Sequence, residues 1–191
     1  KIDIIKSISE RTGGDIYLGV VGAVRTGKST FIKKFIENLV VPNIEDEYER
    51  KRCLDEIPQT AQGKTIMTIE PKFVPSTAAK IKVEEFETNI KLVDCVGYVI
   101  PAAKGYEDEM GEPRMVKTPW YDEDIPFVEA AEIGTEKVIR DHSTIGIVIT
   151  TDGSIGEFDR GDYLEAENRV INELKSIGKP FIVVLNSVHP T

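Results

Sequence analysis

The sequence predicts an α/β fold, in which a mostly parallel sheet with one antiparallel edge strand carries helices on both faces. After a leading helix, strand-like and helix-like segments alternate in the order β-α-β-β-α-β-α-β. Such alternation is typical of a parallel sheet whose crossover helices cover both of its faces. A glycine-bounded loop separates the first strand from the next helix, and loops in this position commonly bind phosphate. With 191 residues, 40% of them hydrophobic, the chain is long enough for one substantial core.

The loop that follows the first strand fits the P-loop pattern G-x-x-x-x-G-K-[ST]. The apolar run 16–21 leads into it as a strand, and Gly27, Lys28 and Ser29 close it at the start of a helix. Glycines let the backbone curl so that its N–H groups point at phosphate oxygens. The lysine is expected to reach the β- and γ-phosphates, and the serine hydroxyl to bind Mg²⁺. The predicted nucleotide-binding residues of this loop are Gly22, Ala23, Val24, Arg25, Thr26, Gly27, Lys28, Ser29 and Thr30.

The first third of the chain is predicted to hold three helical segments around the first strand. Residues 1–12 have apolar positions at helical spacing, and two glycines end this segment. The helix after the loop fades near residues 41–42. The densely charged segment 45–52 is expected to form an exposed helical piece with Leu54 and Ile57. The helix after the loop has apolar residues at helical spacing, namely Phe31, Ile32, Phe35, Ile36 and Leu39.

The later elements are predicted from periodicity and turn residues. Segment 80–86 alternates as a half-buried edge strand does, and a turn is expected near Glu87–Thr88. Residues 89–97 form the next strand. The remaining elements are a helix at 130–142, a buried strand at 144–151, a helix at 160–177 and a last strand at 181–186.

A loop that closes over the γ-phosphate is expected between the first helix and the second strand, at residues 63–71. A threonine in such a loop can complete the Mg²⁺ shell and sense the γ-phosphate. Thr65 and Thr68 are both candidates, and spacing alone does not choose between them.

The strand at 89–97 ends in the sequence Asp94-Cys-Val-Gly97. An aspartate at the carboxyl end of a strand beside the P-loop strand typically holds Mg²⁺. Gly97 lets its backbone N–H approach the γ-phosphate. Asn186 ends the last strand, so the P-loop, Asp94 and Asn186 should meet at the carboxyl edge of the sheet, where nucleotides bind in such folds.

Residues 98–127 form a long segment rich in proline, glycine and acidic residues. Segments of this length without regular structure are uncommon in compact domains unless they are functional or disordered. Its aromatic residues Tyr106, Trp120 and Tyr121 indicate that part of it packs on the domain itself or on a neighbouring subunit. We expect a role in subunit contact or as a nucleotide-responsive switch.

The net charge of −9 argues against general nucleic-acid binding and against direct attraction to an anionic membrane. Two cysteines, Cys53 and Cys95, do not make a disulfide framework, and we expect reduced thiols. No apolar run approaches the roughly 20 residues of a membrane span, and no secretory signal is visible. Because the chain starts with lysine and stops just after a strand, we expect it to be part of a longer protein.

The order of P-loop, threonine-bearing loop, antiparallel strand pair, Asp-x-x-Gly and two βα units resembles the translation-factor-related GTPase superfamily. Segments 12–35, 63–68, 92–98, 103–109 and 149–153 more closely resemble the stage IV sporulation protein A family, the spore-coat morphogenetic ATPases of endospore-forming bacteria. The resemblance spans nearly the whole chain. It implies that residues 1–191 are an amino-terminal P-loop nucleotide-binding domain, with further domains elsewhere in the protein.

The resemblance implies an ATPase with ATP and Mg²⁺ as cofactors. Hydrolysis would drive self-assembly into a static polymer, the basement layer of the spore coat, on the mother-cell side of the forespore surface in the cytoplasm. The polymer would anchor other coat morphogenetic proteins and be tethered to membrane by a small amphipathic peptide. The family roles fall on Lys28 and Ser29, on Asp94 for the metal, and on Thr68 as a catalytic, metal-binding sensor. A second threonine that the family can carry next to that sensor is replaced here by Ile69.

Two departures from ordinary GTPases predict differences in chemistry. Guanine-specific relatives end the last strand in Asn-Lys-x-Asp, whereas residues 186–189 here read Asn-Ser-Val-His, so the guanine-reading aspartate is missing and ATP becomes plausible. Some relatives orient the attacking water with a glutamine directly after Asp-x-x-Gly. In this chain Tyr98 takes that position. We therefore expect slow hydrolysis, with water positioned by the sensor threonine or by a neighbouring subunit. Arg25 is either a charge stabiliser or a solvent-facing loop residue.

Two alternative functions are consistent with the sequence. The first is a structural scaffold that binds nucleotide without productive turnover, which would be the case if no group positions the attacking water. A regulatory GTPase is the other alternative, and it rests on fold analogy alone.

Overall fold

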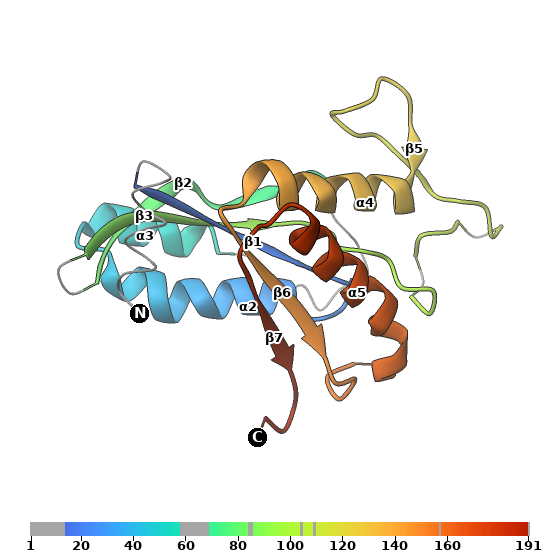
Figure 1. Ribbon diagram of the computed structural model, residues 1–191. Helices are drawn as coiled ribbons and strands as arrows, with labels where there is room; N and C mark the ends of the chain where they lie inside the picture. The colour runs from blue at the N-terminus through green and yellow to red at the C-terminus, as the bar shows by residue number, and fades with distance from the viewer. Residues whose placement is uncertain are drawn as a thin grey trace.

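The computed structural model describes residues 14–57, 69–83, 86–103, 105–108, 110–156 and 158–190 (Figure 1). The expected helix at 1–12 and the threonine-bearing part, 63–68, of the loop expected at 63–71 lie outside these residues. Every other element expected from the sequence lies wholly or mostly within them.

A five-stranded sheet with strand order β2-β3-β1-β6-β7 forms the centre of the molecule. β1 pairs in parallel with β3 and β6, and β6 pairs in parallel with β7. Only β2, at one edge, runs antiparallel to its neighbour β3. The predicted α/β architecture is therefore confirmed. The strands are β1 (Asp15–Gly22), β2 (Lys72–Val83), β3 (Phe86–Asp94), β6 (Ile145–Thr151) and β7 (Phe181–Asn186).

Helices cover both faces of the sheet, as the alternating element order predicts (Figure 1). On one face, Ile32 and Ile36 of the first helix and Cys53 of the next are fully buried against strand residues. On the other face, Val138 and Leu174 are fully buried in a second apolar cluster. The helices are α2 (Lys28–Phe35), continued by a π-helical stretch (Ile36–Val40) and a 3-10 turn (Val41–Asn43), α3 (Glu47–Asp55), α4 (Phe127–Lys137), continued by a π-helical stretch (Val138–His142), and α5 (Arg160–Ser176).

Three local expectations were wrong. Leu39 is 53% exposed, because the π-helical stretch that follows α2 changes the helical period and turns this position away from the core. β2 begins at Lys72 rather than at residue 80, and an irregularity in its pairing between Val74 and Ala79 interrupts the alternation that reveals a strand. Glu87 lies within β3, opposite Lys82, so the turn expected near Glu87–Thr88 is not there.

The long segment 98–127 packs partly on its own domain. Tyr106 and Trp120 contact an apolar cluster that includes Phe127 and Ala130 of α4, whereas Tyr121 is half exposed. The segment contains one short antiparallel pair, β4 (Met115–Val116) with β5 (Ile125–Pro126). Figure 1 shows the loop between these two strands projecting beyond α4.

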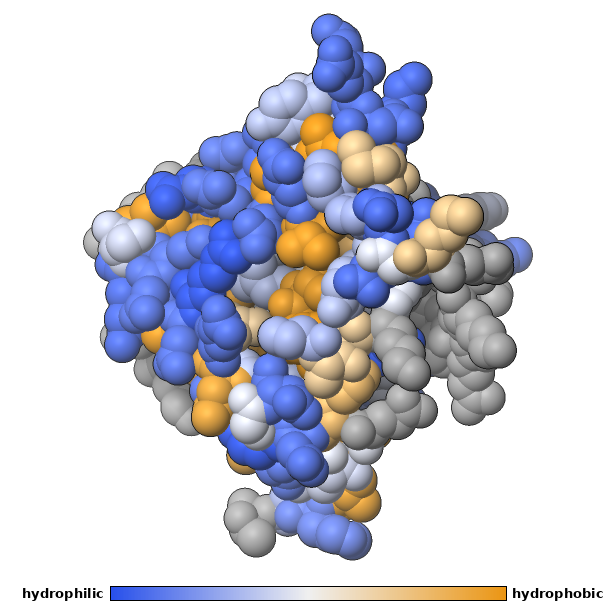
Figure 2. All heavy atoms as spheres, turned by 90° about the vertical axis from the view of Figure 1, so that its right-hand side faces the viewer, coloured by the Kyte–Doolittle hydropathy of each residue, from blue (hydrophilic) through white to orange (hydrophobic). Residues whose placement is uncertain are grey.

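The surface seen from the right-hand side of Figure 1 is hydrophilic around its rim, and apolar side chains gather toward its middle (Figure 2).

Both cysteines are buried and free, as expected. Within the described residues, no helix is long and apolar enough to cross a membrane.

Candidate nucleotide-binding site

The predicted phosphate loop lies between β1, which ends at Gly22, and α2, which begins at Lys28. Gly22 has a φ of +143°, and a Cβ there would collide with the backbone carbonyl oxygen of Ile149 on β6. Gly27 has a φ of +91° and caps the amino end of α2 in a left-handed conformation. The local backbone therefore requires glycine at both positions, since residues with a side chain rarely adopt these backbone dihedrals. Arg25, at the tip of the loop, has a φ of +61° and is exposed.

The side chain of Lys28 is held inside the loop and is only 6% exposed. Its amine donates a hydrogen bond of 2.6 Å to the carbonyl oxygen of Ala23. The hydroxyl of Thr26 donates to the same carbonyl oxygen at 2.9 Å. Burial lowers the pKa of Lys28, and the nearby Cys95 and Asp94 oppose this shift. The loop is thus closed around the amine, which is available to an anion that replaces the carbonyl as its partner.

Asp94 lies at the carboxyl end of β3, next to Val20 of β1 in the sheet. Its Oδ2 accepts a weak hydrogen bond of 3.5 Å from the hydroxyl of Ser29. Its Oδ1 is buried and has no hydrogen-bond partner among the residues that the structure describes. Burial raises the pKa of Asp94, whereas the charge of Lys28 lowers it.

The oxygen atoms of Ser29 and Asp94 fit a Mg²⁺ ion, which prefers oxygen ligands and few carboxylates. A buried carboxylate oxygen without a donor is costly unless a cation or donor satisfies it. Ser29 and Asp94 are therefore the candidate metal ligands here.

Gly97 lies against the phosphate loop. It has a φ of +91°, and a Cβ at this position would collide with the carbonyl oxygen of Gly22 and lie 2.6 Å from Nζ of Lys28. The next residue, Tyr98, donates its backbone N–H to the Gly22 carbonyl at 3.1 Å and accepts a hydrogen bond of 2.9 Å from the N–H of Val24. The Asp-x-x-Gly segment is thus bound to the loop as an extension of the sheet.

Asn186 reaches the same site from the last strand. Its Nδ2 donates to the carbonyl oxygen of Thr26 at 3.1 Å, and a Cβ on Gly27 would come within 2.5 Å of that nitrogen. The structure therefore brings together the loop, Ser29, Asp94, Gly97 and Asn186, as the edge rule predicts. Thr65 and Thr68 lie outside the described residues.

A clasp between two loops was not found from the sequence. The hydroxyl of Ser187, after β7, donates to Oδ2 of Asp152, after β6, at 2.6 Å. Asp152 also accepts from the N–H and the hydroxyl of Ser154. These hydrogen bonds lower the pKa of Asp152 to about 2. The pair Asp152–Gly153 signals a turn, but no local pattern reveals a partner 35 residues away.

The phenol of Tyr98 points away from the phosphate loop. Tyr98 is 2% exposed, and its hydroxyl donates a hydrogen bond of 2.6 Å to Oε2 of Glu173 on α5. Burial, followed by this hydrogen bond, raises the pKa of Tyr98 above its ordinary value. The hydroxyl at this position is thus engaged in the core and does not face the site of the phosphates.

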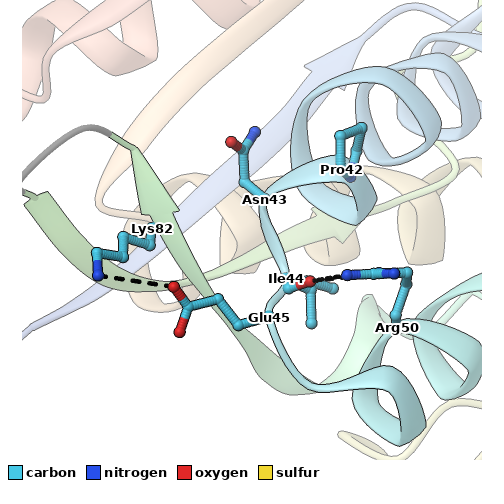
Figure 3. Close-up of a pocket in the computed structure, with 6 residues that line it drawn as sticks. All are labelled: Pro42, Asn43, Ile44, Glu45, Arg50 and Lys82. Atoms are coloured by element: carbon cyan, nitrogen blue, oxygen red, sulfur yellow. Dashed lines mark hydrogen bonds and ion pairs between the residues drawn. The ribbon is translucent and has the colours of Figure 1, made fainter.

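A shallow pocket of about 330 Å³ lies elsewhere, near the end of the first helical segment (Figure 3). Its polar groups are paired with one another: Arg50 donates to the carbonyl oxygen of Ile44 at 2.6 Å, and Lys82 lies 3.6 Å from Glu45. These pairs leave no convergent set of groups for a nucleotide, so the phosphate loop is the better candidate. The pocket is lined by Pro42, Asn43, Ile44, Glu45, Arg50 and Lys82.

The family model described as "Stage IV sporulation protein A, ATPase domain" matches residues 1–191. The whole chain is 70% identical to stage IV sporulation protein A of Bacillus anthracis and 69% identical to that of Bacillus subtilis (strain 168), covering 39% of each protein. It is 58% identical over 189 residues to the Clostridioides difficile (strain 630) protein, covering 98% of this chain and 38% of that protein. The chain therefore spans about two fifths of the length of these relatives.

Proposed function

The chain belongs to the family of the stage IV sporulation protein A ATPase domain, and on this premise we propose that it binds ATP with Mg²⁺ and hydrolyses it. The observation that carries this proposal is the convergence of Lys28, Ser29, Asp94 and Gly97 at one edge of the sheet, between β1 and the start of α2.

Each of these groups has a role in holding a triphosphate. The N–H groups of the loop and the amino end of α2 attract phosphate oxygens. The Lys28 amine exchanges the Ala23 carbonyl for the β- and γ-phosphates. Ser29 and Asp94 hold the Mg²⁺ ion, which neutralises charge on the phosphates when it is bound. Gly97 allows its N–H to approach the terminal phosphate because it has no side chain.

The preference for adenine follows from the end of β7. Asn186 contacts the loop at Thr26, and the residues after it are Ser187, Val188 and His189 rather than a sequence ending in aspartate. Without that acceptor, the donors on the guanine ring lose their partner. The element order supports a fold of the translation-factor-related GTPase type that has changed its base preference.

Hydrolysis is expected to be slow. The residue after Gly97 is a tyrosine whose hydroxyl is engaged with Glu173, so the side chain at this position does not orient water. That task falls to Thr68 or to a neighbouring subunit, and Arg25 is exposed at the loop tip where it can approach a phosphate.

Membership of the family supports a proposal for the role of the whole protein. We propose that hydrolysis drives self-assembly into the basement layer of the spore coat, on the mother-cell side of the forespore surface. Other coat morphogenetic proteins would be partners, with membrane contact made through a small amphipathic peptide and no nucleic acid bound. Segment 98–127 is a candidate subunit contact, because Met110 and Tyr121 in it are exposed.

Equilibrium binding tests the nucleotide assignment. We expect the full-length protein to bind Mg-ATP more tightly than Mg-GTP, and Lys28→Ala to lose this binding. The exposed Lys34→Ala on the same helix is the matched control, since its side chain is 65% exposed. Equal binding by wild type and Lys28→Ala would overturn the assignment.

One observation favours a second candidate function, a scaffold that binds nucleotide without productive turnover. Tyr98 stands where some relatives carry a water-orienting glutamine, and its hydroxyl is bound to Glu173. Multiple-turnover hydrolysis that depends on Asp94 would exclude this candidate.

A further inference from the structure

Tyr98 joins the phosphate loop to the helical layer behind it. Its backbone forms two hydrogen bonds with the loop, to the carbonyl of Gly22 at 3.1 Å and from the N–H of Val24 at 2.9 Å. Because Gly97 precedes it directly, the peptide between Gly97 and Tyr98 cannot move without disturbing this pairing. The position of Gly97 against Lys28 therefore depends on where Tyr98 is held.

The side chain of Tyr98 is held at two points. Its hydroxyl donates to Glu173 of α5 at 2.6 Å. The guanidinium of Arg169, also on α5, lies over its ring at 4.3 Å from the centroid. Arg169 in turn forms two hydrogen bonds with Glu132 of α4, at 2.6 and 3.0 Å. The ring thus ties the phosphate loop to both α4 and α5.

A second tyrosine shows that burial alone does not require this arrangement. Tyr163 is 1% exposed and belongs to the same apolar cluster as Tyr98. Its hydroxyl has no hydrogen-bond partner among the residues that the structure describes. The two tyrosines are therefore equally buried, but only one uses its hydroxyl to fix a segment of the nucleotide site.

We propose that Tyr98 is a positioning residue whose hydrogen bond to Glu173 holds Gly97 in place against the phosphate loop, beside the Lys28 amine. This inference rests on the proposed function, since it concerns the same site. Gly97 lies beside the Lys28 amine and is the residue expected to approach the terminal phosphate, so a displaced Gly97 would affect the γ-phosphate more than the α- and β-phosphates. The hydroxyl of Tyr98 therefore contributes to discrimination of ATP from ADP, although it touches neither.

The test compares Tyr98→Phe with Tyr163→Phe in the full-length protein. Each change removes one buried hydroxyl, but only the first breaks a hydrogen bond. Dissociation constants are measured for a non-hydrolysable ATP analogue and for ADP, each with Mg²⁺. We expect Tyr98→Phe to weaken binding of the ATP analogue about three- to tenfold, the range for loss of one ordinary intramolecular hydrogen bond. ADP binding should change less than twofold in this variant, and Tyr163→Phe should change neither constant.

Amide hydrogen exchange without nucleotide gives an independent readout. We expect the amides of Val24 and Tyr98 to exchange faster in Tyr98→Phe than in wild type. Their exchange rates should be unchanged in Tyr163→Phe. Glu173→Ala should reproduce the effect of Tyr98→Phe. Glu173→Gln, which keeps an acceptor oxygen, should largely restore wild-type behaviour.

The outcomes separate this inference from the proposed function. If wild type binds ATP, Lys28→Ala does not, and Tyr98→Phe behaves as wild type, the positioning role is wrong while the nucleotide site stands. Equal weakening of ATP and ADP by Tyr98→Phe would also overturn it, because a general loss of structure predicts that result. Failure of wild type to bind either nucleotide would overturn the proposed function and this inference together.

Discussion

The amine of Lys28 donates a hydrogen bond of 2.6 Å to the carbonyl oxygen of Ala23, five residues earlier in the same loop. The lysine is therefore already folded into the interior of the loop. Burial lowers its pKa, which means that the charged amine is less well solvated there than in water. A phosphate that replaces the carbonyl gives this cation a stronger partner, so the loop is preorganised for an anion.

Gly97→Ala is expected to abolish tight nucleotide binding. The added Cβ would collide with the Gly22 carbonyl and lie 2.6 Å from Nζ of Lys28, so the loop must shift to accommodate it. Gly178→Ala is the matched control, since Gly178 also has a positive φ but has open space around its Cβ position. The control should cost about 1–2 kcal/mol of unfolding free energy without affecting nucleotide affinity. Normal Mg-ATP binding by Gly97→Ala in a titration would contradict the assigned geometry.

Asp94→Asn should separate stability from metal binding. Burial raises the pKa of Asp94, which means that folding disfavours its charged form at neutral pH. The neutral amide removes this penalty, so we expect the nucleotide-free protein to melt at the same temperature or higher. The further rise in melting temperature that Mg²⁺ gives in the presence of ATP should be lost. A variant that melts lower without ligand and still responds to Mg²⁺ would show that Asp94 does not hold the metal.

The clasp between Asp152 and Ser187 should open in acid. Hydrogen bonds from Ser154 and Ser187 hold the pKa of Asp152 at about 2, below its ordinary value of 3.8. Because the folded-state pKa is depressed, the stabilisation is present above about pH 3.8 and is lost as the pH falls toward 2. Carboxyl titration by NMR measures this directly. Asp152→Asn should remove the titration, and an Asp152 pKa near 3.8 in the wild type would show that the clasp does not form.

The sequence predicts most of the fold because its strands and helices carry their own periodicity and punctuation. The strand at 181–186 was placed with both bounds correct, and the helix at 160–177 ends one residue early. The first half of β2 was missed because the pairing irregularity after Val74 breaks the alternation. Leu39 was wrongly assigned to an apolar face because a π-helical stretch changes the spacing there.

In the candidate site, too, some features can be predicted from the sequence and others cannot. Lys28, Ser29, Asp94 and Gly97 are found from the sequence because local motifs encode the geometry that phosphate and Mg²⁺ need. The contact from Tyr98 to Glu173 and the clasp from Asp152 to Ser187 are not, because each joins residues far apart in the chain through packing of different elements. Such pairings have no spacing rule and require the structure.

Phosphate release by the full-length protein, with Mg-ATP and Mg-GTP in parallel, tests the proposed activity most directly. We predict slow, multiple-turnover release from ATP, weaker release from GTP, and none by Lys28→Ala. Release from ATP that persists in Lys28→Ala, or a preference for GTP, would contradict the proposal that this loop is the site of an ATPase.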